Sequence, residues 1–301
     1  MFEEKRMLFL YVETPLHVGA GKGAGSVDLP IQRERTTGYP TVQSSGVKGC
    51  LRSTFRDVKG WKDDDTQLTS LFGKAGGEGE NYAGAIAPGD ARLLLFPVRS
   101  LGGVFAWVTS AHALANFKRA AHLTGQKIDW IIPDAPGEAE ALVGTTTDLK
   151  AGLDVVLEEF SFTPKSSNEV DAIAKWIAEY ALPADYDYWK KALPRHICIL
   201  SENAFRDFCL HGTEIQTHVR LEPETKVVAQ GALWTTENLP VDTLLYAPLM
   251  ATGIRDGKDN RTAVDVLNEL ASLNITRLQL GGDETTGQGW VAATFYPEVK
   301  K

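Results

Sequence analysis

Cysteine is scarce in this chain of 301 residues, and long apolar runs are missing from it. The cysteines are Cys50, Cys198 and Cys209. An odd number without a Cys-x-x-Cys pair argues against a disulfide framework, and reduced thiols are typical of cytosolic proteins. No apolar run approaches the roughly 18 residues of a membrane span, and no secretory signal follows the first methionine. The sequence therefore predicts a cytoplasmic protein with no membrane partner.

Basic residues are fewer than acidic ones: the chain has 31 Lys and Arg and 39 Asp and Glu, which gives a net charge of −8. Such a balance argues against a general nucleic-acid coat, although it leaves room for a local basic stripe. The six histidines show no spacing of a zinc ligand set. A hydrophobic fraction of 43% is enough for a globular core, and the length suits one core with large insertions, or two domains.

The apolar pattern predicts an α+β fold that opens with a strand at 7–13 and a helix at 46–58. Strands at 91–98 and 104–109 and a helix at 111–123, capped by Ser110, complete the order of a ferredoxin-like or RRM-like unit. The other predicted strands are 154–160, 196–200, 244–250, 275–280 and 290–296, and the other predicted helices are 168–181, 185–192, 201–210 and 260–272.

Three further segments stand out from this pattern. Residues 59–89 are rich in Gly, Asp and Glu, which predicts an insertion at the surface. Residues 125–195 are predicted to form a mainly helical insertion. A hairpin is expected at 214–234, where two β-type runs flank the turn at 222–225. We expect residues 1–301 to form a single domain that holds these insertions.

An unusual loop follows the first strand. It reads His17-Val-Gly-Ala-Gly-Lys-Gly-Ala-Gly, and alternating glycines let backbone amides approach a ligand. The P-loop pattern fails because Lys22 is followed by Gly23, and the dinucleotide-binding pattern fails at every register. The plain alternative is a flexible surface loop. The connection from 14 to 45 is nevertheless too long for an ordinary turn, which indicates a function.

Two side chains that flank this loop are candidates for chemistry. Asp28 precedes Leu-Pro-Ile, and its carboxylate could position a ribose hydroxyl, take its proton or hold a hydrated Mg²⁺. His17 could be a second acid–base group or a phosphate contact. The plainer alternatives are a turn-forming Asp28 and a His17 that caps the end of the first strand.

A second candidate is the start of the predicted helix at 46–58. Ser44 and Ser45 offer hydroxyls and free amides, where the helix dipole favours an anion. Lys48, Arg52 and Arg56 are spaced by four and share one face. The opposite, apolar face contains Val47, Leu51, Phe55 and Val58. The alternative is an ordinary N-cap with solvated cations.

A late glycine-rich segment, 281–289, joins the last two predicted strands and again exposes backbone. The alternative is a long hairpin loop, and its acidic Asp283 and Glu284 do not suit phosphate.

Taken together, these segments resemble the RAMP superfamily of CRISPR proteins. The resemblance rests on His17-Val-Gly-x-Gly, Asp28-Leu-Pro-Ile-Gln-Arg-Glu34, Ser44-Ser-Gly-Val-Lys-Gly-x-Leu-Arg52 and Gly281-Gly-x-x-x-x-Gly287-x-Gly289. Within the superfamily, the sequence is most similar to the fourth, backbone subunit of type III-B (Cmr) effector complexes. The string from Asp28 to Glu34 is the most specific element.

The resemblance implies a modified ferredoxin-like palm with a β-hairpin thumb at 214–234 and helical insertions. It implies a filament of copies along a CRISPR RNA, other Cmr-complex subunits as partners, and single-stranded target RNA that is cut beside each thumb. It also implies a metal-dependent endoribonuclease with loosely bound Mg²⁺ or Mn²⁺, in which the cut uses the neighbouring ribose 2′-hydroxyl.

The resemblance also assigns roles to residues of this chain. Asp28 matches the essential acid and is the one candidate metal contact, and His17 and Glu237 match accessory catalytic positions. We expect RNA contacts at Lys22, Arg33, Ser44, Ser45, Lys48, Arg52, Arg56, Gly282, Gly287 and Gly289.

Two other functions remain open at this point. One is a purely structural RNA-binding backbone subunit in which Asp28 is inert. The other is a metabolic nucleotide-binding enzyme that uses the glycine loop, against which the two failed motifs count.

Overall fold

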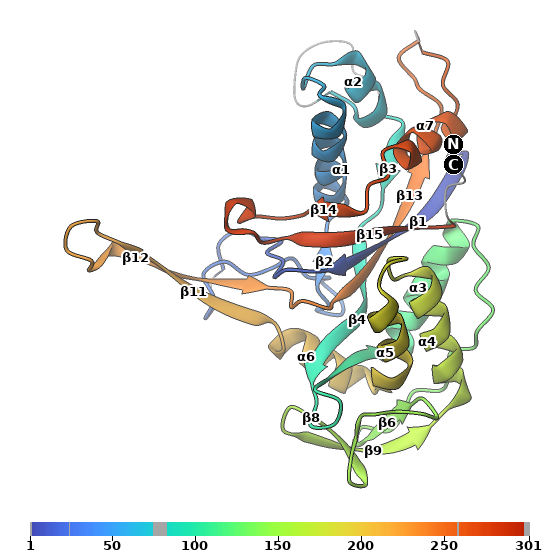
Figure 1. The fold of residues 1–301 in the computed structure, drawn as a ribbon, viewed down its shortest axis with the longest axis vertical. Helices are drawn as coiled ribbons and strands as arrows, with labels where there is room; N and C mark the ends of the chain where they lie inside the picture. Colours follow the sequence, from blue (N-terminus) through green and yellow to red (C-terminus); the bar gives the residue numbers. More distant parts are fainter. Residues whose placement is uncertain (1, 24, 75–82, 258, 298–301) are drawn as a thin grey trace.

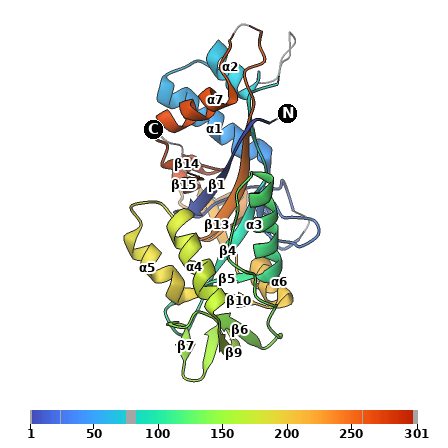
Figure 2. The same ribbon diagram turned by 90° about the vertical axis from the view of Figure 1, so that its right-hand side faces the viewer.

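The computed structural model describes residues 2–23, 25–74, 83–257 and 259–297. In this part of the chain a 13-stranded sheet runs through an elongated body, and a separate two-stranded hairpin projects from its side (Figure 1). Helices α3 (Ala111–Leu123), α4 (Asn168–Tyr180) and α5 (Asp187–His196) lie together in one half of the body (Figure 2). Helices α1 (Ser44–Lys59), α2 (Thr66–Phe72) and α7 (Ala263–Ser272) lie together at the other end (Figure 2). None of the described helices is long and apolar enough to cross a membrane.

The centre of the sheet has ferredoxin-like topology. Its strands follow the order β15-β1-β13-β4, and each neighbouring pair is antiparallel. Helix α1 links β1 to β4, and helix α7 links β13 to the β14–β15 hairpin, as in a split βαβ unit. The bounds are β1 Glu4–Val12, α1 Ser44–Lys59, β4 Ala91–Arg99, β13 Leu244–Ala251, α7 Ala263–Ser272, β14 Arg277–Gln279 and β15 Trp290–Tyr296.

The ferredoxin-like prediction is therefore confirmed, but two of its elements were assigned wrongly. Strand β5 (Phe105–Ser110) and helix α3 (Ala111–Leu123) exist, and Ser110 caps the helix, yet β5 lies beyond β4, outside the central four strands. The third strand of the unit is β13, which the chain reaches only after residue 243. Local apolar patterns predict strands but do not reveal which distant strands pair, so the large insertion was hidden.

Strand β1 shows why its apolar run is continuous. Alternate residues enter two different core clusters, with Leu8 and Leu10 on one face and Met7 and Phe9 on the other. Successive side chains of a strand point to opposite faces, so a sheet that is covered on both faces needs apolar residues at every position.

The two helices of the predicted helical insertion at 125–195 are present, but most of the strands in this segment were not predicted. Besides two helices it contains four short strands that extend the sheet beyond β10. Strands of two to seven residues with mixed exposure leave a weak signal in a sequence, which explains the error. The bounds are β6 Glu140–Val143, β7 Lys150–Ala151, β8 Asp154–Leu157, β9 Phe160–Ser166, α4 Asn168–Tyr180, α5 Asp187–His196 and β10 Ile197–Leu200.

The segment 59–89 is also more than a surface insertion, although residues 75–82 lie outside the described residues. Helix α2 (Thr66–Phe72) buries Leu68, Leu71 and Phe72 against the core, and β3 (Ile86–Pro88) joins the sheet. Glycines and acidic residues dominate the composition of the segment 59–89, so the short apolar stretch of α2 was not predicted to be a buried helix.

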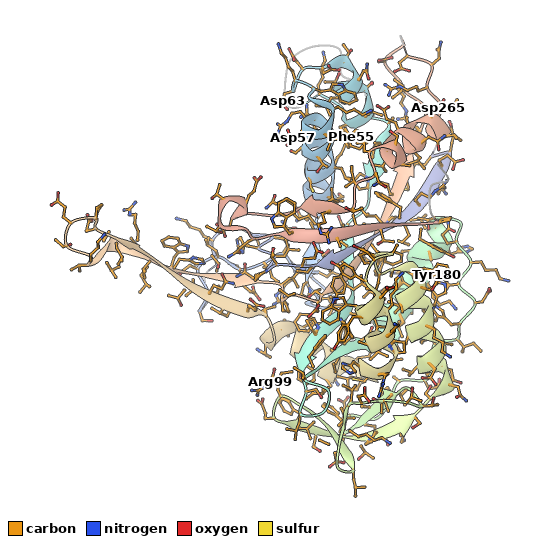
Figure 3. All side chains as sticks on the ribbon, viewed as in Figure 1. Phe55, Asp57, Asp63, Arg99, Tyr180 and Asp265 are labelled. Atoms are coloured by element: carbon orange, nitrogen blue, oxygen red, sulfur yellow. The ribbon has the colours of Figure 1, made fainter. Side chains whose placement is uncertain are left out.

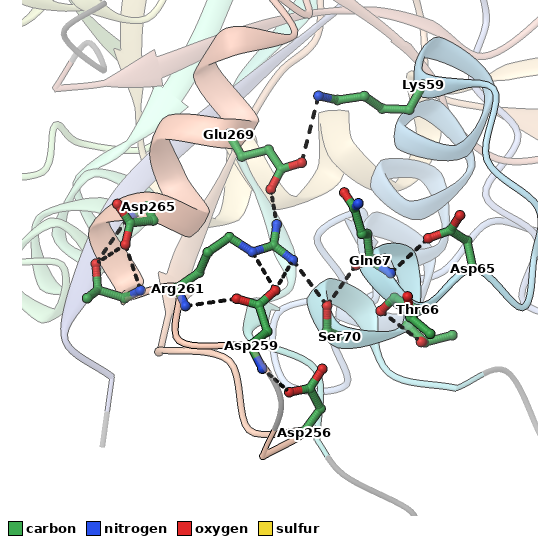
Figure 4. Close-up of polar contacts among 12 residues, drawn as sticks. Lys59, Asp65, Thr66, Gln67, Ser70, Asp256, Asp259, Arg261, Asp265 and Glu269 are labelled. Atoms are coloured by element: carbon green, nitrogen blue, oxygen red, sulfur yellow. Dashed lines mark hydrogen bonds and ion pairs between the residues drawn. The ribbon is translucent and has the colours of Figure 1, made fainter.

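A network of charges fixes α2 to its neighbours (Figure 4). Arg261 pairs with Glu269 on α7, donates to Asp259 at 2.8 Å and reaches the Ser70 hydroxyl on α2 at 3.3 Å. Lys59, at the end of α1, lies 3.7 Å from the second oxygen of Glu269. Three helices and one loop therefore share a single arginine–carboxylate cluster.

The projecting hairpin consists of β11 (Glu214–Leu221) and β12 (Val228–Asn238), which form a two-stranded sheet of their own. It follows α6 (Glu202–His211), and its far end points away from the body (Figure 1). Large apolar residues along it are exposed, and Ile215 and Leu233 are more than half exposed. A two-stranded ribbon of this kind is marginally stable alone, so its base must be held by other segments.

Helix α1 yields a stability prediction. Phe55 is fully buried and its ring centroid lies 5.1 Å from that of Phe72, whereas Val58, which was predicted on the same buried face, is 58% exposed. We expect Phe55→Ala to lower the free energy of unfolding by about 3–5 kcal/mol and Val58→Ala to change it by less than about 0.5 kcal/mol. Denaturant unfolding of both variants measures this, and equal losses would contradict the packing.

Candidate functional site at the base of the hairpin

The base of β12 joins two segments of the early loop. On the side away from β11, the amide of Leu29 donates to the carbonyl of Thr235 at 3.1 Å, and the amide of Glu237 donates back to Leu29 at 2.9 Å. Two residues further along, Leu16 and Leu239 exchange backbone hydrogen bonds of 3.0 and 2.9 Å. The hairpin base is thus a junction that both ends of the glycine-rich loop share.

The glycine-rich loop is ordered over its described residues. Residues 18–23 run back against 28–32, and the amides of Ala20 and Gly23 donate to the carbonyls of Pro30 and Asp28, each at 2.9 Å. The predicted long connection is therefore a folded loop that carries Asp28 to β12. Lys22 is exposed at its tip, so it is available to a ligand.

Asp28 is exposed and is held by one residue, Thr235 on β12. The amide and the hydroxyl of Thr235 donate to Oδ2 of Asp28 at 2.8 and 2.9 Å. The amide of Asp28 donates in turn to the Thr235 hydroxyl at 3.0 Å. Both donors contact the same carboxylate oxygen, and none of the hydrogen bonds among the described residues uses the side-chain Oδ1 of Asp28.

These hydrogen bonds favour the ionised carboxylate. The backbone bond from Thr235, followed by its hydroxyl, lowers the pKa of Asp28 below its ordinary value. Since that ordinary value is about 3.9, Asp28 is a carboxylate at neutral pH and only a weak base. It suits the positioning of a hydroxyl or the attraction of a cation better than the removal of a proton.

His17 lies against the same stretch of β12. Its Nδ1 is 2.7 Å from the carbonyl oxygen of Glu237. A carbonyl only accepts, so Nδ1 must donate, and the neutral ring then has its lone pair on Nε2. A side chain at Gly19 would approach Nε2 to 3.0 Å, so this glycine leaves the space over the ring open.

His17 and Asp28 are thus bound to β12 at positions 237 and 235. Two residues along a strand span roughly 7 Å, so the two groups lie over one short stretch of the hairpin base. The side chain of Asp28 is exposed, whereas the residue His17 is 9% exposed.

Glu237 is buried, and both of its carboxylate oxygens are occupied. Oε1 pairs with Arg33 and accepts from the Thr213 hydroxyl at 2.8 Å, and Oε2 accepts from the amide of Ile31 at 3.0 Å. This geometry argues against the predicted catalytic role, because the carboxylate has no free oxygen for a substrate. Arg33 also donates to backbone carbonyls of Gly38 and of residue 209, so its side chain stabilises the loop, and these bonds argue against the predicted RNA contact.

The late glycine loop packs on the early one. The amide of Gly282 donates to the carbonyl of His17 at 3.0 Å, and the amide of Gly289 donates to Pro15 at 2.9 Å. A Cβ on Gly289 would lie 2.0 Å from a backbone oxygen, and this residue is buried, so its glycine serves close packing and not the predicted RNA contact. Gly282 and Gly287 are exposed, and their RNA contacts stay a prediction.

The basic stripe of α1 is largely neutralised within the chain. Asp63 pairs with Arg52 at 2.8 Å and with Arg56 at 3.3 Å, and Arg56 also pairs with Asp57. Asp57 and Asp63 lie at the end of α1 near α2, far from the hairpin (Figure 3). Lys48 is nearer the start of α1 and has no ion pair among the described residues; partial burial lowers the pKa of its ammonium.

The start of α1 is less open to anions than the sequence suggested. The amide of Ser44 already donates to the carboxylate of Asp90 at 2.8 Å, and the cap residue Gln43 has no side-chain cap bond. Gln32 accepts from the amide of Gln43 and so ties this helix to the early loop. Ser45 is exposed and remains available.

Asp28 brings a carboxylate with an unoccupied oxygen to the junction of the early loop and β12. No group of three or more His, Cys, Asp or Glu that could hold a metal ion occurs in the described part of the chain. Asp28 alone could therefore bind only a loosely held cation that keeps most of its water ligands. All three cysteines are free thiols, as expected.

The roles of two residues of this site escaped the sequence analysis. Thr235 belongs to the segment 235–238 that the resemblance matches to an accessory position, but its hydrogen bonds to Asp28, 207 positions away in the sequence, were not predicted. Gly19 was read as one glycine of a run, whereas its place beside the His17 ring singles it out. Neither role has a local sequence signal, because both depend on long-range contacts.

A ferredoxin-like centre, a projecting hairpin and glycine loops at its base define a class of CRISPR protein. The chain belongs to the RAMP superfamily, whose family model matches residues 9–292.

Individual relatives agree over nearly the whole chain. It is 38% identical over 289 residues to the CRISPR system Cmr endoribonuclease Cmr4 of Pyrococcus furiosus, which covers 95% of this chain and 94% of that protein. The crystal structure of oligomeric Cmr4 from Pyrococcus furiosus superposes with a TM-score of 0.74 at 31% identity, over 99% of this chain and 100% of that one. These similarities confirm the predicted family.

A more distant structure shares the fold. A chain in the cryo-EM structure of the Type III-B Cmr-beta bound to cognate target RNA has a TM-score of 0.73 at 20% identity, over 99% of each chain.

The buried pair at the hairpin base yields a second stability prediction. We expect Glu237→Gln to lower the free energy of unfolding by about 1–3 kcal/mol, because Arg33 loses its charged partner and the donors around the carboxylate are mismatched. Glu224→Gln, at the exposed tip of the same hairpin, is the control and should change stability by less than about 0.5 kcal/mol. Denaturant unfolding that finds both variants equally stable would contradict a structural role for Glu237.

Proposed function

We propose that this chain is the target-cutting backbone subunit of a type III-B CRISPR effector complex. It binds guide RNA, assembles with copies of itself and with other Cmr-complex subunits, and cleaves complementary target RNA. The observation that supports this most directly is the exposed, ionised Asp28, which is held at the base of the projecting hairpin. The 38% identity with a protein named an endoribonuclease supports the same conclusion.

The reaction we propose is a transesterification within the target strand. The 2′-oxygen of one ribose attacks the adjacent phosphorus, and the bond from phosphorus to the 5′-oxygen of the next nucleotide breaks. The 2′-hydroxyl loses its proton and the departing oxygen gains one. The products are a 2′,3′-cyclic phosphate and a 5′-hydroxyl end.

The residues at the hairpin base supply orientation and charge for this step. Asp28 accepts a hydrogen bond from the attacking 2′-hydroxyl. A nucleotide that the hairpin displaces from a duplex can adopt the in-line geometry that the attack needs. His17 offers Nε2 as a proton acceptor over the same stretch of β12.

A divalent cation such as Mg²⁺ or Mn²⁺ would supply charge stabilisation at the phosphate when bound. Asp28 is the residue that would hold it, loosely, since its free oxygen is a suitable hard ligand.

The exposed apolar hairpin and the acidic surface suit an assembled subunit. A marginally stable ribbon with exposed Ile215 and Leu233 gains a partner when copies stack and a duplex lies against it. The net charge of −8 is compatible with RNA binding if the RNA lies on a narrow face and other surfaces meet protein.

Removal of the Asp28 charge tests the catalytic role. In a reconstituted complex, we expect Asp28→Ala and Asp28→Asn to assemble and bind target RNA normally, while the single-turnover cleavage rate falls by about a hundredfold or more. The reason is that these variants lose the carboxylate that Thr235 holds at the hairpin base with Oδ1 unoccupied among the described hydrogen bonds.

Asp185→Ala, an exposed loop acid elsewhere in the chain, is the matched control and should cleave like wild type. Unchanged cleavage by the Asp28 variants would instead identify the chain as a structural RNA-binding subunit.

A second test concerns the predicted guide-RNA contacts of Lys48 and Arg52, for which the structure predicts effects of different size. Lys48→Gln should weaken guide-RNA binding and reduce the slope of log affinity against log salt by about 0.7–0.9, the loss of one phosphate contact. Arg52→Gln should have a smaller effect, because Asp63 already pairs with Arg52. Titrations at several salt concentrations measure this, with the exposed Lys191→Gln as control; a Lys48 variant with the wild-type slope would exclude Lys48 from the RNA contact.

A further inference from the structure

We propose that Thr235 positions the Asp28 carboxylate. The amide and hydroxyl of Thr235 bind Oδ2 of Asp28, and Oδ1 is left for the RNA. This inference rests on the proposed function, since it names the residue that prepares Asp28 for cleavage. It concerns a residue that acts through another and does not itself touch the reacting atoms.

The geometry of the pair leaves the hydroxyl little choice of orientation. The amide of Asp28 donates to the Thr235 hydroxyl at 3.0 Å, so one lone pair of that oxygen is occupied. Its single hydrogen then points to Oδ2 of Asp28 at 2.9 Å, beside the Thr235 amide at 2.8 Å. One residue thus binds both the backbone and the side chain of Asp28, and the carboxylate cannot rotate without breaking two bonds.

Stability alone does not require this arrangement. The neighbouring backbone is already held by the bonds of Leu29 to β12 and by the bond from Ile31 to Glu237. Asp28 itself is exposed, where hydrogen bonds contribute little to folding because water competes for the same groups. The hydroxyl of Thr235 therefore contributes mainly to the direction and charge of the carboxylate.

The position of Thr235 also links the carboxylate to the hairpin. The residue lies on β12 opposite Thr217 of β11, and it follows Trp234, whose ring stacks on His218 at a centroid distance of 5.4 Å. If RNA that binds against the hairpin displaces β12, Asp28 moves with this strand. Cutting therefore depends on how the target RNA lies against the hairpin.

Threonine is well suited to the task. Its β-branched side chain has a restricted χ1 in a strand, so the hydroxyl is presented at low entropic cost. Valine keeps that shape without the hydroxyl, and serine keeps the hydroxyl without the methyl group. The two substitutions therefore separate the hydrogen bond from the packing.

The test compares Thr235→Val, Thr235→Ser and the control Thr217→Val in the reconstituted complex. Single-turnover cleavage by Thr235→Val should fall about tenfold, the loss of roughly one hydrogen bond in the transition state, with target-RNA affinity unchanged. Thr235→Ser and Thr217→Val should stay within about twofold of wild type.

A second readout does not depend on activity. Carboxyl NMR titration of the folded chain should show the pKa of Asp28 below its ordinary value in wild type and in Thr235→Ser. In Thr235→Val the pKa should rise toward about 3.9, because one donor to the ionised form is lost.

The outcomes separate this inference from the proposed function. If Thr235→Val titrates and cleaves like wild type while Asp28→Ala is inactive, Thr235 has no positioning role and the proposed function stands. A shifted pKa without a loss of rate overturns the inference in the same way. If Asp28→Ala cleaves normally, the proposed function fails, whatever the titration shows.

Discussion

The pairing of residues 28–31 with the base of β12 is the constraint on which the site depends. Two backbone hydrogen bonds at Leu29 and one bond from Ile31 to Glu237 make this loop segment an added strand of the hairpin. Asp28 lies at the end of that strand, and its carbonyl accepts from the amide of Gly23 while its amide donates to the Thr235 hydroxyl. A flexible glycine-rich loop could not hold a carboxylate in one place without such a surface to bind.

The remaining features follow from this pairing. Glu237 and Arg33 form a partly buried ion pair beside the added strand. The late glycine loop packs on His17 because Gly281 lets its backbone approach. Residues that looked like chemistry in the sequence therefore divide into two groups. Those with an unoccupied polar atom, Asp28 and His17, remain candidates for the reaction, and those with every atom paired serve the architecture.

Most elements of the fold could be predicted from the sequence, since apolar periodicity and caps such as Ser110 depend on local contacts. The pairing of β13 with β1 and β4 could not, because it joins residues about 150 or more positions apart. In the site, Asp28 was found through a motif, whereas Thr235 was not. The burial of Glu237 and the pairing of Arg52 with Asp63 were hidden for the same reason: the charge of a residue is visible in a sequence, but its partner is not.

Native-state hydrogen exchange tests the central claim most directly. If the hairpin base holds the catalytic segment, the amides of Leu29 and Ile31 exchange slowly and open together with the amide of Glu237. If they exchange at the rate of an unstructured peptide while Glu237 stays protected, the segment is not bound to β12 in solution, and the account of Asp28 fails.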